Sequence, residues 1–172
     1  LARSAAWQAR QLAAHATQGV VIFIDEPIYS ALGTAAYLSV KSEDLRSTVG
    51  EVSSAVHAEA GLTGIHCCGN ADWEAVLSSD IDVLNFDAWG YTPTLTIYAD
   101  SVAAFLDRGG TLAWGIVPTS DEIADATEQR IAEKLDAAVA EFASRGIDEA
   151  RLRHQSILTP SCGCGSLSVE QT

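Results

Sequence analysis

The most informative segment of the sequence is Leu62-Thr63-Gly64-Ile65-His66-Cys67-Cys68-Gly69-Asn70. It is an apolar run of strand length that ends in a histidine and two thiols. Side chains of residues i and i+2 in a strand point to the same side. We therefore expect a strand over residues 62–66, with His66 and Cys68 facing one point together and Cys67 facing away.

A second thiol cluster lies near the end of the chain and reads Thr159-Pro160-Ser161-Cys162-Gly163-Cys164-Gly165; the two clusters hold all four cysteines. One imidazole and two thiolates suit Zn²⁺. The sequence therefore predicts a zinc site held by His66, Cys68 and Cys162, with Cys164 as the alternative to Cys162. Three protein ligands leave a fourth position open, which is typical of catalytic rather than structural zinc.

The same pattern, an apolar run followed by polar residues, recurs along the chain. We expect strands over residues 20–24, 62–66, 81–86 and 111–117, and a fifth strand that residues 152–158 lead into. Helical segments at 5–17, 42–60, 72–77, 98–106 and 121–144 separate them. Such alternation predicts βα units and a parallel sheet. Ligands bind beyond the carboxyl ends of the strands in parallel α/β folds, so the polar motifs are expected to surround one pocket.

Residues 1–172 are expected to form a single α/β domain with five parallel βα units. A complete (β/α)₈ TIM barrel needs about 250 residues, so five units are too few. The prediction is the C-terminal part of such a barrel, with the first strands absent from the chain. An open sheet is the alternative architecture.

Composition narrows the class of protein. The 172 residues are 48% apolar and 19% charged, which is typical of a globular domain. No apolar run reaches the roughly 18 residues of a membrane span, and no secretory signal is recognisable. The formal net charge of −13 disfavours nucleic acid and anionic membranes as partners. We expect a cytoplasmic protein with reduced thiols.

Taken together, the motifs resemble those of the cobalamin-independent methionine synthase family, in its short catalytic-core form. That family belongs to a superfamily of barrels with uroporphyrinogen decarboxylase and the methylcobamide-dependent thiol methyltransferases. It carries a His-x-Cys motif, an acidic residue after the next strand, a Pro-x-Cys-Gly turn and an acidic turn. Here these are His66-Cys67-Cys68, Asp87, Pro160-Ser161-Cys162-Gly163 and Asp25-Glu26-Pro27.

The resemblance implies a zinc-dependent methyltransferase that methylates a thiol, with homocysteine giving methionine as the leading case. It implies that Asp25 binds the substrate amine, with Glu26 beside it, and that Asp87 acts at the catalytic centre. The family's acidic ligand is usually Glu, and Asp87 reaches one methylene less far. The implied methyl donor is a methylated corrinoid, delivered by a corrinoid protein as partner, or a folate. Trp89 follows the third strand and is expected to wall the substrate pocket.

Two other functions remain open at this stage. One is a decarboxylase like uroporphyrinogen decarboxylase, whose chemistry needs no metal and calls for a basic pocket, whereas this chain is acidic. The other is a non-catalytic protein that carries zinc or a corrinoid. A carrier has no need for Asp25 as an amine anchor, so thiol-dependent methyl transfer separates it from the enzyme.

Overall fold

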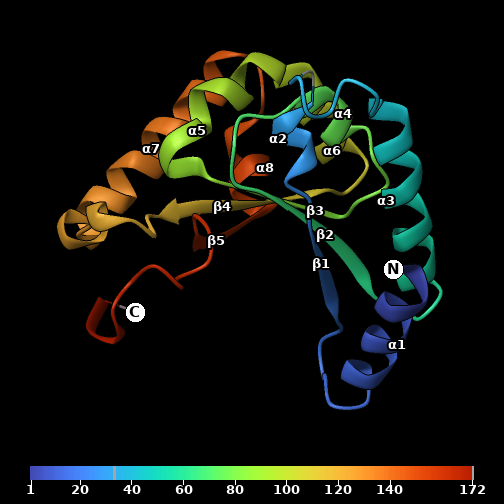
Figure 1. The fold of residues 1–172 in the computed structure, drawn as a ribbon. Coiled ribbons are helices and arrows are strands. Elements are labelled where there is room, and N and C mark those ends of the chain that lie inside the picture. The colour runs from blue at the N-terminus through green and yellow to red at the C-terminus, as the bar shows by residue number, and fades with distance from the viewer. Residues whose placement is uncertain (33, 172) are drawn as a thin grey trace.

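The computed structural model of the protein describes residues 1–32 and 34–171. Within them, one parallel sheet has the strand order β1-β2-β3-β4-β5, which is also the order along the chain (Figure 1). The strands are β1 (Val21–Asp25), β2 (Leu62–Cys67), β3 (Val83–Phe86), β4 (Thr111–Val117) and β5 (Ser156–Pro160). The predicted α/β fold with five parallel strands is confirmed.

Helices fill the connections and lie over one face of the sheet (Figure 1). The α-helices are α1 (Ala2–Ala13), α2 (Ile28–Ala31), α3 (Ser42–His57), α4 (Trp73–Leu77), α5 (Ala88–Leu95), α6 (Ala99–Asp107), α7 (Glu128–Ser144) and α8 (Glu149–His154). Three short 3₁₀ helices are η1 (Thr96–Tyr98), η2 (Asp121–Asp125) and η3 (Val169–Gln171). Among the described residues, no helix combines the length and apolar character that crossing a membrane requires.

The helical predictions need correction in several places: α2 and α8 were not predicted, and residues 152–154, expected to lead into the fifth strand, belong to α8. The helix expected over residues 121–144 is divided into η2 and α7, because Thr127 accepts a hydrogen bond from the backbone N–H of Arg130 and so begins a new helix. Helix α5 was not predicted. Its sequence contains Gly90 and Pro93, which weaken a helical pattern, and its start is set by the carboxylate of Asp87, which accepts the N–H of Gly90 at 2.8 Å.

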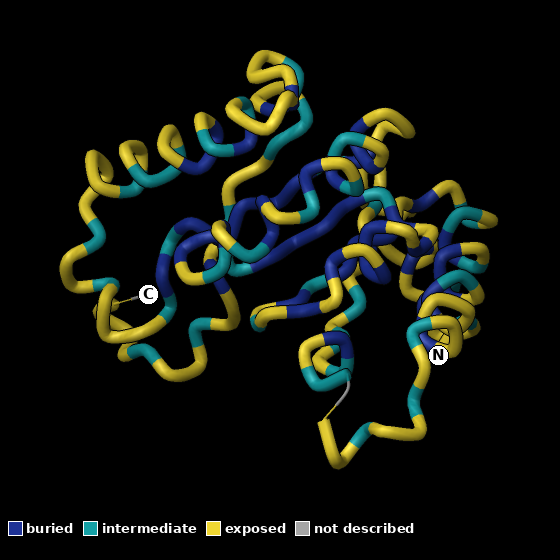
Figure 2. Tube along the Cα trace, turned by 90° about the horizontal axis from the view of Figure 1, so that it is seen from above, coloured by how far each residue is buried: buried dark blue, intermediate teal, exposed yellow. Residues whose placement is uncertain are grey.

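The core lies between the sheet and the helices. Its centre is a row of aromatic rings, Trp73, Phe86, Trp114 and Phe142, whose neighbouring centroids are 6.2, 5.4 and 5.8 Å apart. All four rings are buried. Figure 2 shows the buried trace running through the sheet and the inward turns of the helices, with the outward turns exposed. This row of rings packs β3 and β4 against helices α4 and α7.

Among the described residues, no α-helix covers the opposite face of the sheet, which we call the bare face (Figure 1). Val21, Phe23, Leu62 and Ile157 on this face are between 42% and 49% exposed. Register pairs Phe23 with Gly64, and the Phe23 ring takes the space that a side chain at Gly64 would need. The polar ends of the strands, including Asp25 and His66, rise from this same face.

Candidate metal centre

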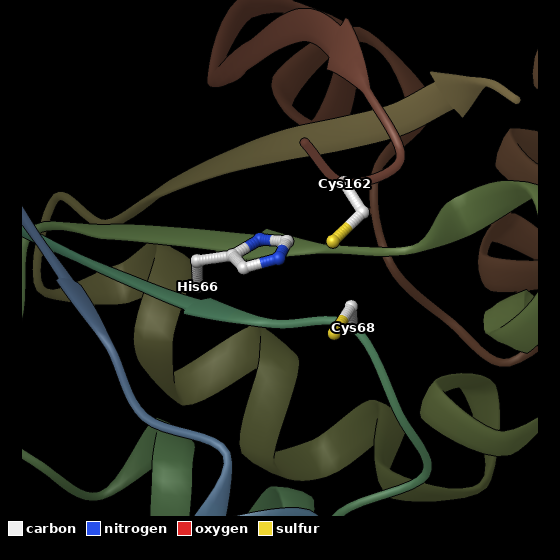
Figure 3. A group of neighbouring side chains, drawn as sticks. All are labelled: His66, Cys68 and Cys162. Atoms are coloured by element: carbon white, nitrogen blue, oxygen red, sulfur yellow. The ribbon is translucent and has the colours of Figure 1, made fainter. Parts of the chain in front are cut away.

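The structure brings His66, Cys68 and Cys162 together at the carboxyl end of the sheet (Figure 3). One ligand atom from each residue lies within 4.8 Å of the others. His66 comes from the end of β2, Cys68 follows β2 directly, and Cys162 follows β5. Cys67 points into the core and is 1% exposed, as the strand alternation predicted. In the described part of the chain, no other set of three such residues gathers in this way.

In the ring of His66, one nitrogen has a hydrogen-bond partner and the other has none among the described residues. Nδ1 lies 2.5 Å from Oδ1 of Asn85 on the neighbouring strand β3. Nε2 is buried, and no described residue forms a hydrogen bond with it. A buried polar atom without a partner is costly. An imidazole nitrogen with a free lone pair beside two thiols is a donor set that fits Zn²⁺.

The turn that carries Cys162 is anchored through the residue before it. Ser161 is buried, and its Oγ accepts the backbone N–H of Thr119 at 3.2 Å and lies 3.1 Å from the Thr119 hydroxyl. The backbone N–H of Ser161 donates to the carbonyl of Val117. At Gly115 a Cβ atom would lie 2.8 Å from the Cα of Ser161. These contacts fix Cys162 relative to the end of β4.

The two thiols influence each other. The pKa of Cys68 is raised above its ordinary value, chiefly by burial of the thiol and then by its hydrogen bond and charge interaction with Cys162. Without a metal, Cys68 is therefore held as a thiol at neutral pH. A bound cation reverses this effect, because a coordinated thiol loses its proton.

Asp25 stands beside the centre, where the sequence placed it. It pairs in register with His66 across β1 and β2. With His66 and Cys162 it lines two adjacent hollows. The first, the Phe23 hollow, has about 310 Å³ and is also lined by Phe23 and Asn85. The second, the Pro27 hollow, has about 360 Å³ and extends along Glu26, Pro27 and Cys68.

Glu26 has a structural partner as well as a place at the site. Its carboxylate accepts the backbone N–H of Ile28 at 2.9 Å, at the start of α2. Its own backbone N–H donates to the carbonyl of His66. Glu26 therefore joins the acidic turn to β2, and only part of its carboxylate is left to face the Pro27 hollow.

Asp87 and Trp89 line a third space, the Trp89 hollow, of about 510 Å³, which also reaches Cys68 and Cys162. Asp87 lies outside the three-residue group, and burial raises the pKa of its carboxyl group. The indole N–H of Trp89 donates to Glu122 at 3.0 Å. The ring of Trp89 packs against the ammonium of Lys134, 3.9 Å from the ring centroid. Trp89 thus walls this hollow with its N–H already paired.

Two further residues complete the comparison with the sequence. Cys164 is half-buried and does not join the group, so the geometry favours Cys162. Asn85 was not predicted as part of the site. The sequence feature that could have indicated Asn85 is its polar side chain inside the apolar strand Val83–Phe86. Asn85 also lies two residues before Asp87, and therefore on the same face of the strand.

Comparison with known proteins adds no family assignment: no protein-family model matches this chain, and a search of curated proteins finds no significant match. The function is therefore inferred from the geometry of the site.

Proposed function

We propose that the protein is a zinc-dependent methyltransferase that transfers a methyl group to the thiol of an amino acid, with homocysteine as acceptor and methionine as product. The observation that carries the proposal is the buried, unpartnered Nε2 of His66 beside the thiols of Cys68 and Cys162. Three ligands leave a coordination position for the sulfur of a substrate.

His66, Cys68 and Cys162 would hold the metal. Zn²⁺ bound there supplies one effect, lowering the pKa of a substrate thiol so that its sulfur is a thiolate nucleophile. That sulfur attacks the methyl carbon of the donor. The new S–C bond would form as the bond from methyl to donor breaks, and the electron pair of that bond would leave with the donor; a folate donor would also take up the proton that the thiol released.

Asp25 would bind the ammonium group of the acceptor. Its carboxylate lines the Phe23 and Pro27 hollows together with His66 and Cys162, so one small molecule can reach both. Each hollow has the volume of a small-molecule site. The methyl donor, a methylated corrinoid or a folate, would then approach through the Trp89 hollow, past Asp87.

The bare face of the sheet supports a closed barrel as the complete architecture. Strands in sequential order with helices over a single face are the arrangement of a (β/α)₈ barrel, whereas doubly wound sheets reverse their order and carry helices on both faces. Apolar residues are also exposed on both sides of the edge strand β5, at Ile157 and Leu158. Further βα units would cover these residues and enclose the site.

The test of the proposal is a methyl-transfer assay on zinc-loaded protein with homocysteine, using methylcobalamin and 5-methyltetrahydrofolate in parallel. Methionine formation that disappears in Cys68→Ser and Cys162→Ser is the expected result. Zinc bound at the site without thiol methylation from either donor would favour the zinc or corrinoid carrier instead.

Substitution of Asp25 by Asn tests the amine anchor. Loss of a charge-assisted contact costs about 1.5–3 kcal/mol in a closed site, and less where solvent screens the carboxylate. We expect Asp25→Asn to weaken binding of homocysteine up to roughly a hundredfold but to leave binding of 4-mercaptobutanoate, the same thiol without the amine, nearly unchanged. Equal weakening of both would contradict the assignment.

A further inference from the structure

We propose that Asn85 is the positioning residue of the metal centre. Its side-chain amide determines which nitrogen of His66 is free to bind a metal, and it ties the His66 ring to the strand that carries Cys162. The inference rests on the proposed role of His66, Cys68 and Cys162 as ligands. One of its consequences, the tautomer of His66, can be measured without metal.

The orientation of the Asn85 amide is fixed by its own partners. Nδ2 donates to the carbonyl oxygen of Ala113 at 3.0 Å and to Oγ1 of Thr159 at 2.8 Å. Both amide hydrogens therefore have acceptors. A flipped amide would place Oδ1 against the carbonyl of Ala113, with no hydrogen between two acceptors. Oδ1 is thereby directed at His66.

This orientation decides the tautomer of His66. The Oδ1 atom of Asn85 only accepts hydrogen bonds, so the contact at 2.5 Å requires the hydrogen on Nδ1 of His66. A neutral imidazole carries a single ring hydrogen, which leaves a lone pair on Nε2. Nε2 is the buried atom that no described residue satisfies. Asn85 therefore presents His66 with its metal-binding lone pair toward the thiols.

The same side chain joins the two halves of the site. Asn85 stands on β3, and it reaches across β4 to Thr159 on β5. The reach is possible because the residues of β4 that lie on this face near Asn85, Ala113 and Gly115, are small. Thr159 lies on the strand that leads directly to Cys162. One buried amide thus connects the histidine ligand of β2 with the strand that delivers the distant thiol.

The first measurement is zinc affinity, determined by competition with a chromophoric chelator. Asn85→Leu keeps the approximate volume and removes every hydrogen bond of the amide. Loss of a hydrogen-bond partner behind a histidine ligand typically weakens metal binding 10- to 100-fold, and we expect a loss in that range. Asn85→Asp keeps an acceptor for Nδ1 of His66 but sets its second oxygen against the carbonyl of Ala113, so we expect it to recover only part of the affinity.

The second measurement is the tautomer of His66 in zinc-free protein, read from long-range ¹H–¹⁵N spectra with the ring neutral. We expect hydrogen on Nδ1 in the wild type and a mixture of tautomers in Asn85→Leu. Ser79→Ala is the matched control, since Ser79 is buried, bonds the hydroxyl of Tyr29 at 3.0 Å and takes no part in the metal centre. It should lower stability and leave both readouts unchanged.

The outcomes separate the two proposals. A wild-type protein that binds no zinc overturns the proposed function. Hydrogen on Nε2 in zinc-free wild type, or wild-type zinc affinity in Asn85→Leu, overturns the role of Asn85 alone. Weakened zinc binding in Ser79→Ala that matches the loss in Asn85→Leu would also overturn it, because the effect would then follow stability rather than the tautomer.

Discussion

Adjacent cysteines at the end of β2 have opposite environments. Cys67 lies in the core, and burial raises the pKa of its thiol. Its sulfur contacts the carbonyl of Gly69 at 3.9 Å. Cys68 is exposed and faces Cys162. The alternation of a strand thus places one thiol in the core and the other in the candidate metal centre.

Thiol labelling should reveal this difference. In folded, zinc-free protein we expect a maleimide to modify Cys68 and Cys162, and zinc to protect both. Cys67 should react only after unfolding, because a thiolate must be accessible to react. Cys164 serves as internal control and should react equally with and without zinc. Peptide mass spectrometry gives the pattern, and protection of Cys164 in place of Cys162 would contradict the ligand set.

Zinc affinity should rise with pH. Binding must remove the proton of Cys68, whose pKa is raised first by burial and then by the Cys162 thiol. Protons therefore compete with the metal up to and beyond the ordinary thiol pKa, and the competition fades as pH increases. We expect steadily tighter binding between about pH 7 and pH 9, with proton release measurable by calorimetry in buffers of different ionisation enthalpy. Constant affinity over this range would indicate that Cys68 is not a ligand.

The three candidate metal ligands could be predicted from the sequence because each depends on a local rule. His66 and Cys68 follow from the two-residue period of a strand, and Cys162 from a second reactive cluster after another strand. The role of Asn85 was not predictable, since it depends on the register that aligns Asn85 with His66 and on small residues in β4. Register is a property of the packed sheet.

At the scale of elements, the end of β4 is where added side-chain volume would disturb the site most directly. A Cβ atom at Gly115 would lie 2.5 Å from the carbonyl oxygen of Phe86 and 2.8 Å from the Cα of Ser161. Both neighbours are backbone atoms, so the strand ends themselves would have to move. The close approach of β3, β4 and the turn after β5 is what brings Cys162 within reach of β2.

Gly115→Ala should therefore damage both stability and metal binding. We expect a loss of about 1–3 kcal/mol in the free energy of unfolding, the usual cost of overpacking, and a weaker zinc site because Cys162 is displaced. Gly163→Ala is the matched control beside Cys162, since a Cβ atom there meets nothing within 4 Å. Denaturant titrations and zinc competition measure the two effects. Equal behaviour of the two variants would show that close packing at Gly115 does not position the turn.

The boundaries of helices are poorly predicted by the spacing of apolar residues alone. The apolar spacing in residues 121–144 continues across the break, and only the cap at Thr127 separates η2 from α7. Helix α5 is concealed by Gly90 and Pro93 but forms because Asp87 caps it and Ala88, Thr92 and Leu95 are buried. Tertiary burial decides in favour of a helix there, against weak local propensity.

At the scale of the whole molecule, barrel closure can be tested by hydrogen exchange. If further βα units complete the barrel, the edge strands β1 and β5 gain partners for their free backbone groups. In a chain that includes such units, we expect peptides from β1 and β5 to exchange as slowly as those from β3. Residues 1–172 alone provide the control, in which both edge strands should exchange faster. Fast exchange of β1 and β5 in the longer chain would contradict a closed barrel.

The sequential strand order has a consequence for folding. His66 stands on the second strand and Cys162 follows the fifth, with β3 and β4 between them. A chain that is still being synthesised, or one that has lost its last strand, cannot assemble the donor set. Binding to the native state alone stabilises that state by mass action, so the free energy of zinc ligation at this site would stabilise the entire sheet rather than a local loop. Metal capture would then be a late event, and a sensitive report that folding has been completed.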